Sequence, residues 1–224
     1  MSIFYHVKES VVKKFVLSLA ALIGLASAQA MAATTDLSVT GTVTPAACTP
    51  TFANGGVVDY GTLAVTDLDH NEFQDHYWLP AKSISFAIEC SAPATFALIS
   101  NDNRRASGDG MGGIFGLGTH QDQKIGGYRI RWLNANVTVD GAQGTTVESM
   151  DGGNTWTNAA GGQFEDAESW PWFRSGFSTG AEVRPTSATS VGVVMDIHGF
   201  VLKDLPFHDL VKLDGSSTIE LVYL

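Results

Sequence analysis

The run Thr218-Ile219-Glu220-Leu221-Val222-Tyr223-Leu224 at the C-terminus has the residue pattern of a β-strand. Ile219, Leu221 and Tyr223 share one face, and a period of two is typical of a strand with one buried side. The run ends at the last residue of the sequence, so no tail is expected to cover its edge. An uncovered edge presents unpaired backbone N–H and C=O groups to other chains. We therefore expect this strand to act through an interface.

The same alternation recurs further from the C-terminus. In residues 36–43, Leu37, Val39, Gly41 and Val43 fall on one side of a strand pattern. Pro45 and Pro50 are expected to end or bend that ladder, because proline cannot donate a backbone hydrogen bond. Further strands are predicted at residues 57–63, 84–90, 95–100, 127–133 and 191–197.

Glycine, asparagine and aspartate clusters separate many of these runs, as expected for turns. Only residues 205–213 have room for a helical turn or two, with Pro206 near the start. Residues 108–118 and 151–177 are rich in glycine, and the second stretch also in aromatic residues, so both predict long loops or irregular hairpins. The sequence therefore predicts an all-β protein, a β-sandwich with long loops.

The N-terminus has the order of a secretory signal peptide. Lys8, Lys13 and Lys14 precede an apolar stretch at residues 15–26, which small residues follow. The apolar stretch is shorter than the about 20 residues of a membrane span. We expect cleavage after Ala32, with Ala30 as the alternative, so that residues 1–32 are removed and the exported chain has no transmembrane span.

Charge and length limit the partners of the exported chain. The whole sequence carries a formal net charge of −10, and removal of residues 1–32 takes away three lysines and one glutamate, which leaves −12 on 192 residues. An acidic chain without Lys/Arg clusters argues against nucleic acid or anionic lipid as a partner. The length fits one domain with a substantial core.

Cys48 and Cys90 are the two cysteines of the sequence. An even count in an exported chain predicts one disulfide. Closing a loop of this size stabilises the fold by about 4 kcal/mol in the chain-entropy model. A metal site would need more ligands nearby, and a catalytic thiol would need a positioned histidine.

Two glycine motifs lack the context that their chemistry requires. Gly108, Gly110 and Gly113 match G-x-G-x-x-G, but the following residues are not expected to open a helix for a pyrophosphate, so a glycine-rich turn is favoured. Residues 176–180 match G-x-S-x-G around Ser178, but Pro185 would interrupt the helix that a nucleophile elbow needs.

A partial calcium-loop pattern is equally weak. Asp67, Asp69 and Asn71 begin such a loop, but Glu72 replaces the glycine of its sharp turn and Trp78 replaces its bidentate carboxylate. The histidines of the exported chain show no metal-ligand spacing. We therefore expect no catalytic, metal or cofactor site and no enzymatic activity.

Trp156, Trp170 and Trp172 lie in the aromatic stretch at residues 151–177. Aromatic residues in irregular segments usually anchor a loop on the sheet, and burial of each one contributes about 1.5–3 kcal/mol or more. Exposed tryptophans also form flat platforms for sugar rings. We favour anchoring, and the alternative function is a glycan-binding adhesin or secreted carbohydrate-binding module that uses these three residues.

Three stretches resemble the subunits of chaperone-usher fimbriae. Residues 41–48 resemble the G-x-V-x-x-x-x-C opening of these pilin-like proteins, and residues 84–90 match the spacing and alternation before their second cysteine. The ending at residues 219–224 resembles their C-terminal chaperone-recognition strand, with its penultimate tyrosine. Shorter stretches at residues 115–118, 124–128 and 151–156 are similar to a less studied family of exported bacterial proteins described as beta-fimbriae subunits.

The resemblance implies an immunoglobulin-like sandwich that lacks its final strand. A periplasmic chaperone lends a strand to the open groove, and at the outer-membrane usher the N-terminal extension of the next subunit replaces it. Such β-strand addition needs no cofactor. The implied partners are the chaperone, the usher and other fimbrial subunits, with a surface glycan under the alternative function. The implied location is the periplasm in transit and then a fimbria on the cell surface, where the protein contributes to adhesion.

The resemblance also assigns roles to residues. Leu37, Val39 and Gly41 would be donor side chains of an N-terminal extension at residues 33–40, before a single domain at residues 41–224. In the C-terminal strand, the residues expected to contact the chaperone are Ile219, Leu221, Tyr223 and Leu224. Two features depart from the family: the extension is short, and Val211 stands where a glycine is usual.

Overall fold

The computed structural model describes residues 34–43, 46–71, 75–108, 110, 112–180 and 182–224. The chain divides into two units, Met1–Val43 and Thr44–Leu224. The predicted signal peptide, residues 1–32, lies outside the described residues. In the part of the chain that is described, no helix is long and apolar enough to cross a membrane.

The described part of the first unit, residues 34–43, contains no helix or strand. The side chains of Leu37 and Val39 are 90% and 88% exposed. The strand predicted from the alternation of residues 36–43 is therefore wrong. Alternation records which side chains share a face, but a strand also needs a neighbour to accept and donate its backbone hydrogen bonds.

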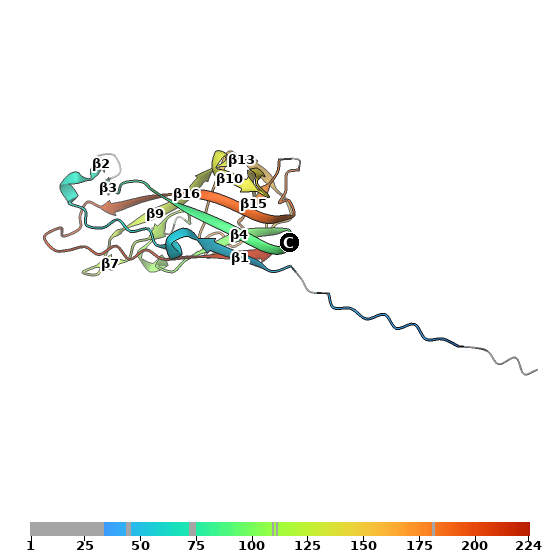
Figure 1. Ribbon diagram of the computed structural model, residues 1–224. Helices are drawn as coiled ribbons and strands as arrows, with labels where there is room; N and C mark the ends of the chain where they lie inside the picture. The colour runs from blue at the N-terminus through green and yellow to red at the C-terminus, as the bar shows by residue number, and fades with distance from the viewer. Residues whose placement is uncertain (1–33, 44–45, 72–74, 109, 111, 181) are drawn as a thin grey trace, which may run out of the picture. The chain divides into compact units, whose positions relative to one another are not determined.

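The second unit is built from β-strands joined by loops and short 3₁₀ helices (Figure 1). The strands are β1 (Cys48–Phe52), β2 (Asp69–Asn71), β3 (His76–Trp78), β4 (Lys82–Ala94), β5 (Phe96–Asp102), β6 (Phe115–Gly116), β7 (Thr119–His120), β8 (Gln123–Lys124), β9 (Gly126–Leu133), β10 (Val137–Val139), β11 (Ala142–Gln143), β12 (Thr145–Ser149), β13 (Thr157–Ala159), β14 (Gly161–Gln163), β15 (Arg174–Ser178), β16 (Ala188–Leu202) and β17 (Ser217–Tyr223). The 3₁₀ helices are η1 (Ala53–Gly56), η2 (Val65–Asp67), η3 (Arg105–Ser107) and η4 (Asn134–Asn136). The predicted all-β class is confirmed.

The strands form a β-sandwich. The larger sheet has the order β1-β4-β16-β10-β11, and β3 and β9 also pair with the long strand β16. The smaller sheet has the order β13-β12-β15-β5-β17. Side chains from both sheets meet in one core, among them Phe86 and Val193 from the larger sheet and Leu98 and Phe177 from the smaller.

Most of the predicted strands are confirmed. Residues 84–90 lie in β4, residues 95–100 largely in β5, residues 127–133 in β9, residues 191–197 in β16 and the C-terminal run largely in β17. In β16, the residues that fill the core follow the period of two that the sequence shows: Val191, Val193, Met195 and Ile197.

The disulfide between Cys48 and Cys90 is confirmed. It joins β1 to β4, where the two cysteines are cross-strand partners with Cα atoms 3.9 Å apart. The sequence predicted that Pro50 would end or bend a strand. Instead, Pro50 lies inside β1 opposite Ile88. Proline is tolerated there because β1 is the outermost strand of its sheet, and one side of an edge strand needs no ladder donors.

Two other predictions about local structure are wrong. Residues 57–63 form no strand. Asn54, Gly55 and Gly56 have φ values of 52°, 62° and 80°, and this left-handed backbone in η1 turns the chain away from β4 before residue 57. Residues 205–213 form turns rather than a helix, since Leu205 is buried but Leu210 is exposed and no helical stripe exists.

The two glycine-rich stretches are largely irregular, as predicted. Residues 108–118 contain only the short strand β6 within the part that is described. Residues 151–177 also contain β13, β14 and most of β15, and Phe164 and Phe173 from this stretch are buried. Aromatic anchoring therefore occurs through phenylalanine, whereas Trp170 and Trp172 are exposed and Trp156 is half-buried.

Candidate functional site

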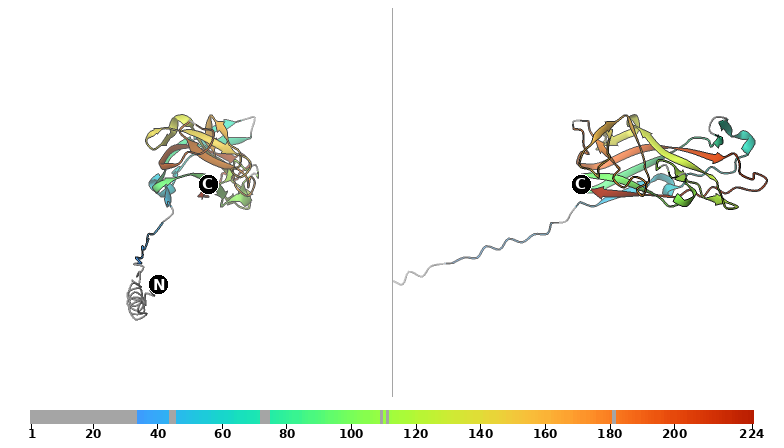
Figure 2. Two further views of the ribbon diagram at one scale, coloured as in Figure 1. Left: turned by 90° about the vertical axis from the view of Figure 1, so that its right-hand side faces the viewer. Right: turned by 180° about the vertical axis from the view of Figure 1, so that it is seen from behind.

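The outermost strands of the two sheets lie beside each other. β1 is the edge of the larger sheet and β17 is the edge of the smaller one. Where β1 begins and β17 ends, the backbone N–H of Cys48 donates to the hydroxyl of Tyr223 at 2.8 Å. Figure 2 shows from two sides that the C-terminus lies at the end of the second unit where β1 starts. The two edges are therefore joined at this end.

Beyond that junction, an apolar groove separates the two edges. Its first cavity, about 410 Å³, lies between Phe52 at the end of β1 and Ser217 at the start of β17. Core side chains of the larger sheet line this cavity: Ile84, Ile130 and Ile197. The sandwich is therefore not closed along this side.

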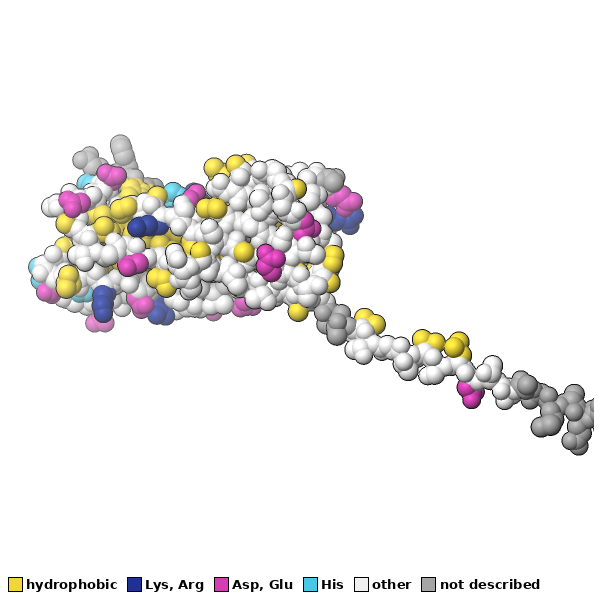
Figure 3. Space-filling model, viewed as in Figure 1, with side chains coloured by type: hydrophobic (Ala, Val, Ile, Leu, Met, Phe, Trp, Pro, Cys, Tyr) yellow, Lys and Arg dark blue, Asp and Glu magenta, His cyan; other side chains and the backbone are white. Residues whose placement is uncertain are grey.

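A second cavity continues the first. It has a volume of about 550 Å³ and lies between residues 58–68 and residues 207–213. The two cavities share Val58, Tyr60, Leu79 and Leu213, so we treat them as one feature and call it the edge groove. Figure 3 shows hydrophobic side chains gathered on the left of the view, the end that carries β2 and β3 in Figure 1.

Most of the groove lining is apolar, and several of its side chains are half-buried. Val58, Leu68, Phe207, Val211 and Leu213 pack against the core with part of their surface still exposed. Soluble proteins rarely expose a large contiguous apolar surface, and an open groove lined by apolar side chains usually marks a binding site. These residues come from segments that pair with no strand, and so strand patterns did not identify them.

Two tyrosines bring polar atoms into the groove. Burial raises the pKa of Tyr60, and the hydroxyl of Tyr60 is buried without a hydrogen-bond partner among the described residues. Burial raises the pKa of Tyr128 to about 12, against a smaller lowering by its hydrogen bond with Ser217.

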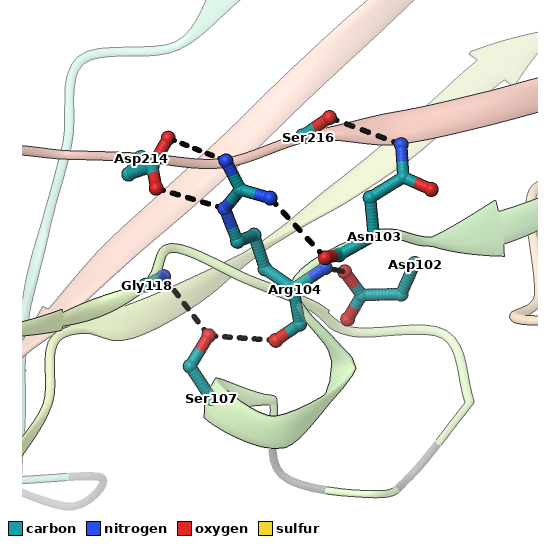
Figure 4. A network of polar contacts seen from close by, with 7 residues as sticks. All are labelled: Asp102, Asn103, Arg104, Ser107, Gly118, Asp214 and Ser216. Carbon is teal, nitrogen blue, oxygen red and sulfur yellow. Dashed lines mark hydrogen bonds and ion pairs between the residues drawn. The ribbon is translucent and has the colours of Figure 1, made fainter.

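A polar network holds the β17 side of the groove (Figure 4). The guanidinium of Arg104 donates to both carboxylate oxygens of Asp214, at 2.8 and 3.0 Å. The side chain of Asn103 donates to the Ser216 hydroxyl at 3.0 Å. These contacts tie the end of β5 to the residues that precede β17, next to the groove residues Leu213 and Gly215.

The same network continues into the glycine-rich stretch. The carboxylate of Asp102 accepts from the backbone N–H groups of Arg104 and Gly116, each at 2.8 Å. Ser107 donates to the Arg104 carbonyl at 2.7 Å and accepts from the Gly118 N–H at 2.9 Å. A Cβ at Gly116 would lie 2.3 Å from the Ser107 hydroxyl, so this close approach requires glycine.

The C-terminal strand borders the groove as a full member of the smaller sheet. β17 pairs antiparallel with β5 from Ser217 opposite Asp102 to Tyr223 opposite Phe96. Ile219 and Leu221 are half-buried and pack against the core, whereas Tyr223 and Leu224 are 50% and 53% exposed. The predicted strand is confirmed, and the contact of these residues with a chaperone stays a prediction.

The expected donor residues lie in the first unit. Leu37 and Val39 are exposed, and nothing lies within 4 Å of a Cβ built at Gly41. Their use as a donor strand also stays a prediction.

The three tryptophans differ in their surroundings. Trp156 is half-buried, and its indole N–H donates to the Gly153 carbonyl at 3.0 Å. Trp172 is 65% exposed and packs against Gly152, whereas Trp170 is 50% exposed and lies against Gly112 beside Glu165. Hydrogen bonds from Thr155 lower the pKa of Asp151 to about 2 and fix the loop beneath Trp156. Glycan contact by these rings stays a prediction.

The rejected catalytic motifs have the geometry of turns. The Ser178 hydroxyl is buried, donates to the Glu182 carbonyl at 2.9 Å and accepts from the Gly180 N–H at 3.0 Å. Within the described residues no helix directly follows either glycine motif. Among those residues, no group of three or more His, Cys, Asp or Glu side chains is placed to hold a metal ion.

Comparison with known proteins gives partial matches. Residues 37–130 match a family described as a protein of unknown function, DUF1120. The uncharacterized protein YhcF of Escherichia coli strain K12 is 24% identical over 217 residues, which cover 84% of this chain and 90% of YhcF. Protein GltF of the same strain is 28% identical over 228 residues, which cover 85% of this chain and 88% of GltF. No solved structure matches the chain. The chain is therefore similar to two bacterial proteins over most of its length.

Proposed function

We propose that the protein is a structural subunit of a bacterial fimbria and that its edge groove receives a β-strand from another chain. A periplasmic chaperone supplies this strand first, and the N-terminal extension of a neighbouring subunit replaces it at the outer-membrane usher. The observation that carries the proposal is the edge groove itself. Core side chains line a gap between two sheet edges, which is what a sandwich without its last strand requires.

An added strand would both pair with a free sheet edge and fill the apolar cavities of this gap. Its backbone pairs with the free edge of β1 or β17, and its alternate side chains enter the apolar cavities. The extension has a matching pattern, because Leu37 and Val39 are two residues apart and exposed. Burial of each such side chain contributes about 1.5–3 kcal/mol.

The chaperone contact belongs to the C-terminal strand in this proposal. Ile219 and Leu221 already face the core, so the chaperone strand pairs with the outer backbone edge of β17 and packs beside these two side chains. Tyr223 and Leu224 are more exposed and remain accessible at the end of the strand.

Export and location form part of the same proposal. The disulfide between Cys48 and Cys90 fits an oxidising compartment such as the periplasm. The signal peptide, passage through the periplasm and display on a surface fimbria follow from the fimbrial role, and no catalytic step is involved.

The extension offers a test with a matched control. Donor-face substitutions Leu37→Asp and Val39→Asp, made together, are expected to abolish the SDS-resistant oligomer ladder of unheated surface extracts. The pair Ser38→Asp and Thr40→Asp adds the same charge to the opposite face and is expected to retain the ladder. The proposal fails if the wild-type protein forms no ladder and is recovered from the periplasm as a lone monomer.

A further inference from the structure

A third cavity lies on a different part of the sandwich. It has a volume of about 440 Å³ and is lined by residues of β9, β14 and β16 together with Glu148 of β12. We call it the rim pocket. It shares no lining residue with the edge groove, so a ligand there is independent of the proposed strand addition.

One wall of the rim pocket is a row of polar side chains across neighbouring strands. Gln163 of β14 pairs with Arg131 of β9, and Arg131 pairs with Asp196 of β16. The next residue in the row, Ser83 of β4, donates to the Asp196 carboxylate at 2.7 Å. Cross-strand partners place their side chains on the same face of a sheet, so these groups converge.

Glycine keeps the pocket open above a rigid floor. A Cβ at Gly162 would lie 2.1 Å from the Trp132 ring, and a Cβ at Gly161 would lie 2.2 Å from the Trp132 carbonyl. Neither position can carry a side chain without displacing Trp132. Trp132 is buried, and its indole N–H donates to the Thr146 hydroxyl at 2.9 Å, so the floor is fixed before a ligand binds.

The side chains of Arg131 and Glu148 have hydrogen-bond donors and acceptors that a ligand could use. Neither side chain forms a hydrogen bond within residues 46–71, 75–108, 110, 112–180 and 182–224. Glu148 is half-buried, and burial followed by the charge of Glu165 raises its pKa. A half-buried carboxylate without a donor gains from a ligand that supplies one.

The charges at the pocket are mixed in sign. Arg131 and the nearby Arg129 oppose Glu148, Asp196 and Glu165. A strongly charged ligand would meet a like charge on at least one side. A neutral polyhydroxylated ligand instead offers both donors and acceptors, which this arrangement can satisfy.

We propose that the rim pocket binds a neutral saccharide. The Arg131 guanidinium donates to sugar oxygens, and the carboxylates of Glu148 and Asp196 accept from sugar hydroxyls. The pocket volume lies within the range usual for small-ligand sites.

The test uses the exported protein in the form recovered from the periplasm. Saturation-transfer difference NMR is run with the methyl glycosides of glucose, galactose, mannose and N-acetylglucosamine, and with methylammonium and inorganic phosphate as charged probes. At least one glycoside is expected to bind. Arg131→Met and Glu148→Gln are each expected to weaken it about tenfold or more, the loss expected for a hydrogen bond to a charged group.

Two matched variants control for general effects of charge. Arg184→Met and Glu168→Gln remove exposed charges outside the pocket and are expected to leave saccharide binding unchanged. Circular dichroism melts confirm that all four variants are folded. The proposal is overturned if no glycoside binds, if both pocket variants bind as the wild type does, or if a charged probe binds more tightly than every glycoside.

Discussion

At the scale of single residues, the chemistry of the groove depends on how deeply its tyrosines are buried. Tyr128 lies in the core and also lines the edge groove. Its burial disfavours the phenolate and raises the pKa to about 12, from 10.0 for an exposed tyrosine. Because the neutral phenol is favoured in the fold, its contribution to stability is complete below pH 10 and is lost as the pH rises through about 12.

We therefore predict that Tyr128→Phe makes the protein less sensitive to alkali. Phenylalanine keeps the ring but cannot ionise, so the alkaline unfolding transition is expected to move to higher pH, although the hydrogen bond with Ser217 is lost. The measurement is circular dichroism against pH, with absorbance at 295 nm to follow phenolate formation. An unchanged alkaline midpoint would show that Tyr128 does not couple unfolding to pH.

Single residues differ in how far sequence alone predicts them. The disulfide was predictable because the sequence offers one possible pair, Cys48 and Cys90. The unpaired hydroxyl of Tyr60 was not predictable, because its burial depends on Gly199 and other residues distant in the sequence. The role of Asp102 also required the structure, since its carboxylate accepts from Gly116 across a loop.

At the scale of elements, the side chain of Tyr223 joins the two sheet edges at one end. The hydroxyl of Tyr223 on β17 accepts from the Cys48 N–H on β1. We predict that Tyr223→Phe raises the amide hydrogen-exchange rate of Cys48 by about two- to tenfold, as expected for the loss of one net hydrogen bond. NMR exchange measurements at Cys48 test this, with Thr51 as an internal reference on the same strand. Equal rates at Cys48 in both proteins would mean that the bond does not hold the edges together.

Element prediction succeeded where alternation coincided with pairing. β4 and β16 alternate cleanly and are neighbours in the larger sheet, with Phe86 opposite Val193. Residues 57–63 have a similar apolar content, but the left-handed turn in η1 removes them from the sheet. β1 was missed because Pro50 argues against a strand unless the strand is known to be an edge. Pairing is a non-local property, and a local pattern cannot supply it.

At the scale of the whole molecule, the edge groove arises because the edges of β1 and β17 and the core side chains between them are left uncovered. The sequence predicted a strand with a free edge, and that edge is present in β17. It did not predict the residues of the groove, because residues 58–68 and 207–213 belong to no strand and meet only in the folded protein. The apolar content of these two segments was the signal that could have identified them.

The groove also makes the stability of the whole molecule depend on its occupant. A protein that lacks residues 34–43 has no extension of its own to donate, so a synthetic peptide of these residues is expected to enter the groove and raise the melting temperature. At a peptide concentration of 100 times its dissociation constant, the free energy of unfolding rises by about 2.7 kcal/mol through mass action alone. The same peptide with Leu37→Asp and Val39→Asp is expected to have no effect, because a carboxylate in an apolar cavity costs more free energy than the burial returns. Differential scanning calorimetry over a peptide titration measures both. If the native peptide leaves the melting temperature unchanged at every concentration, this segment is ruled out as the occupant. If both peptides shift the melting temperature equally, the apolar face is ruled out as the part that the groove recognises.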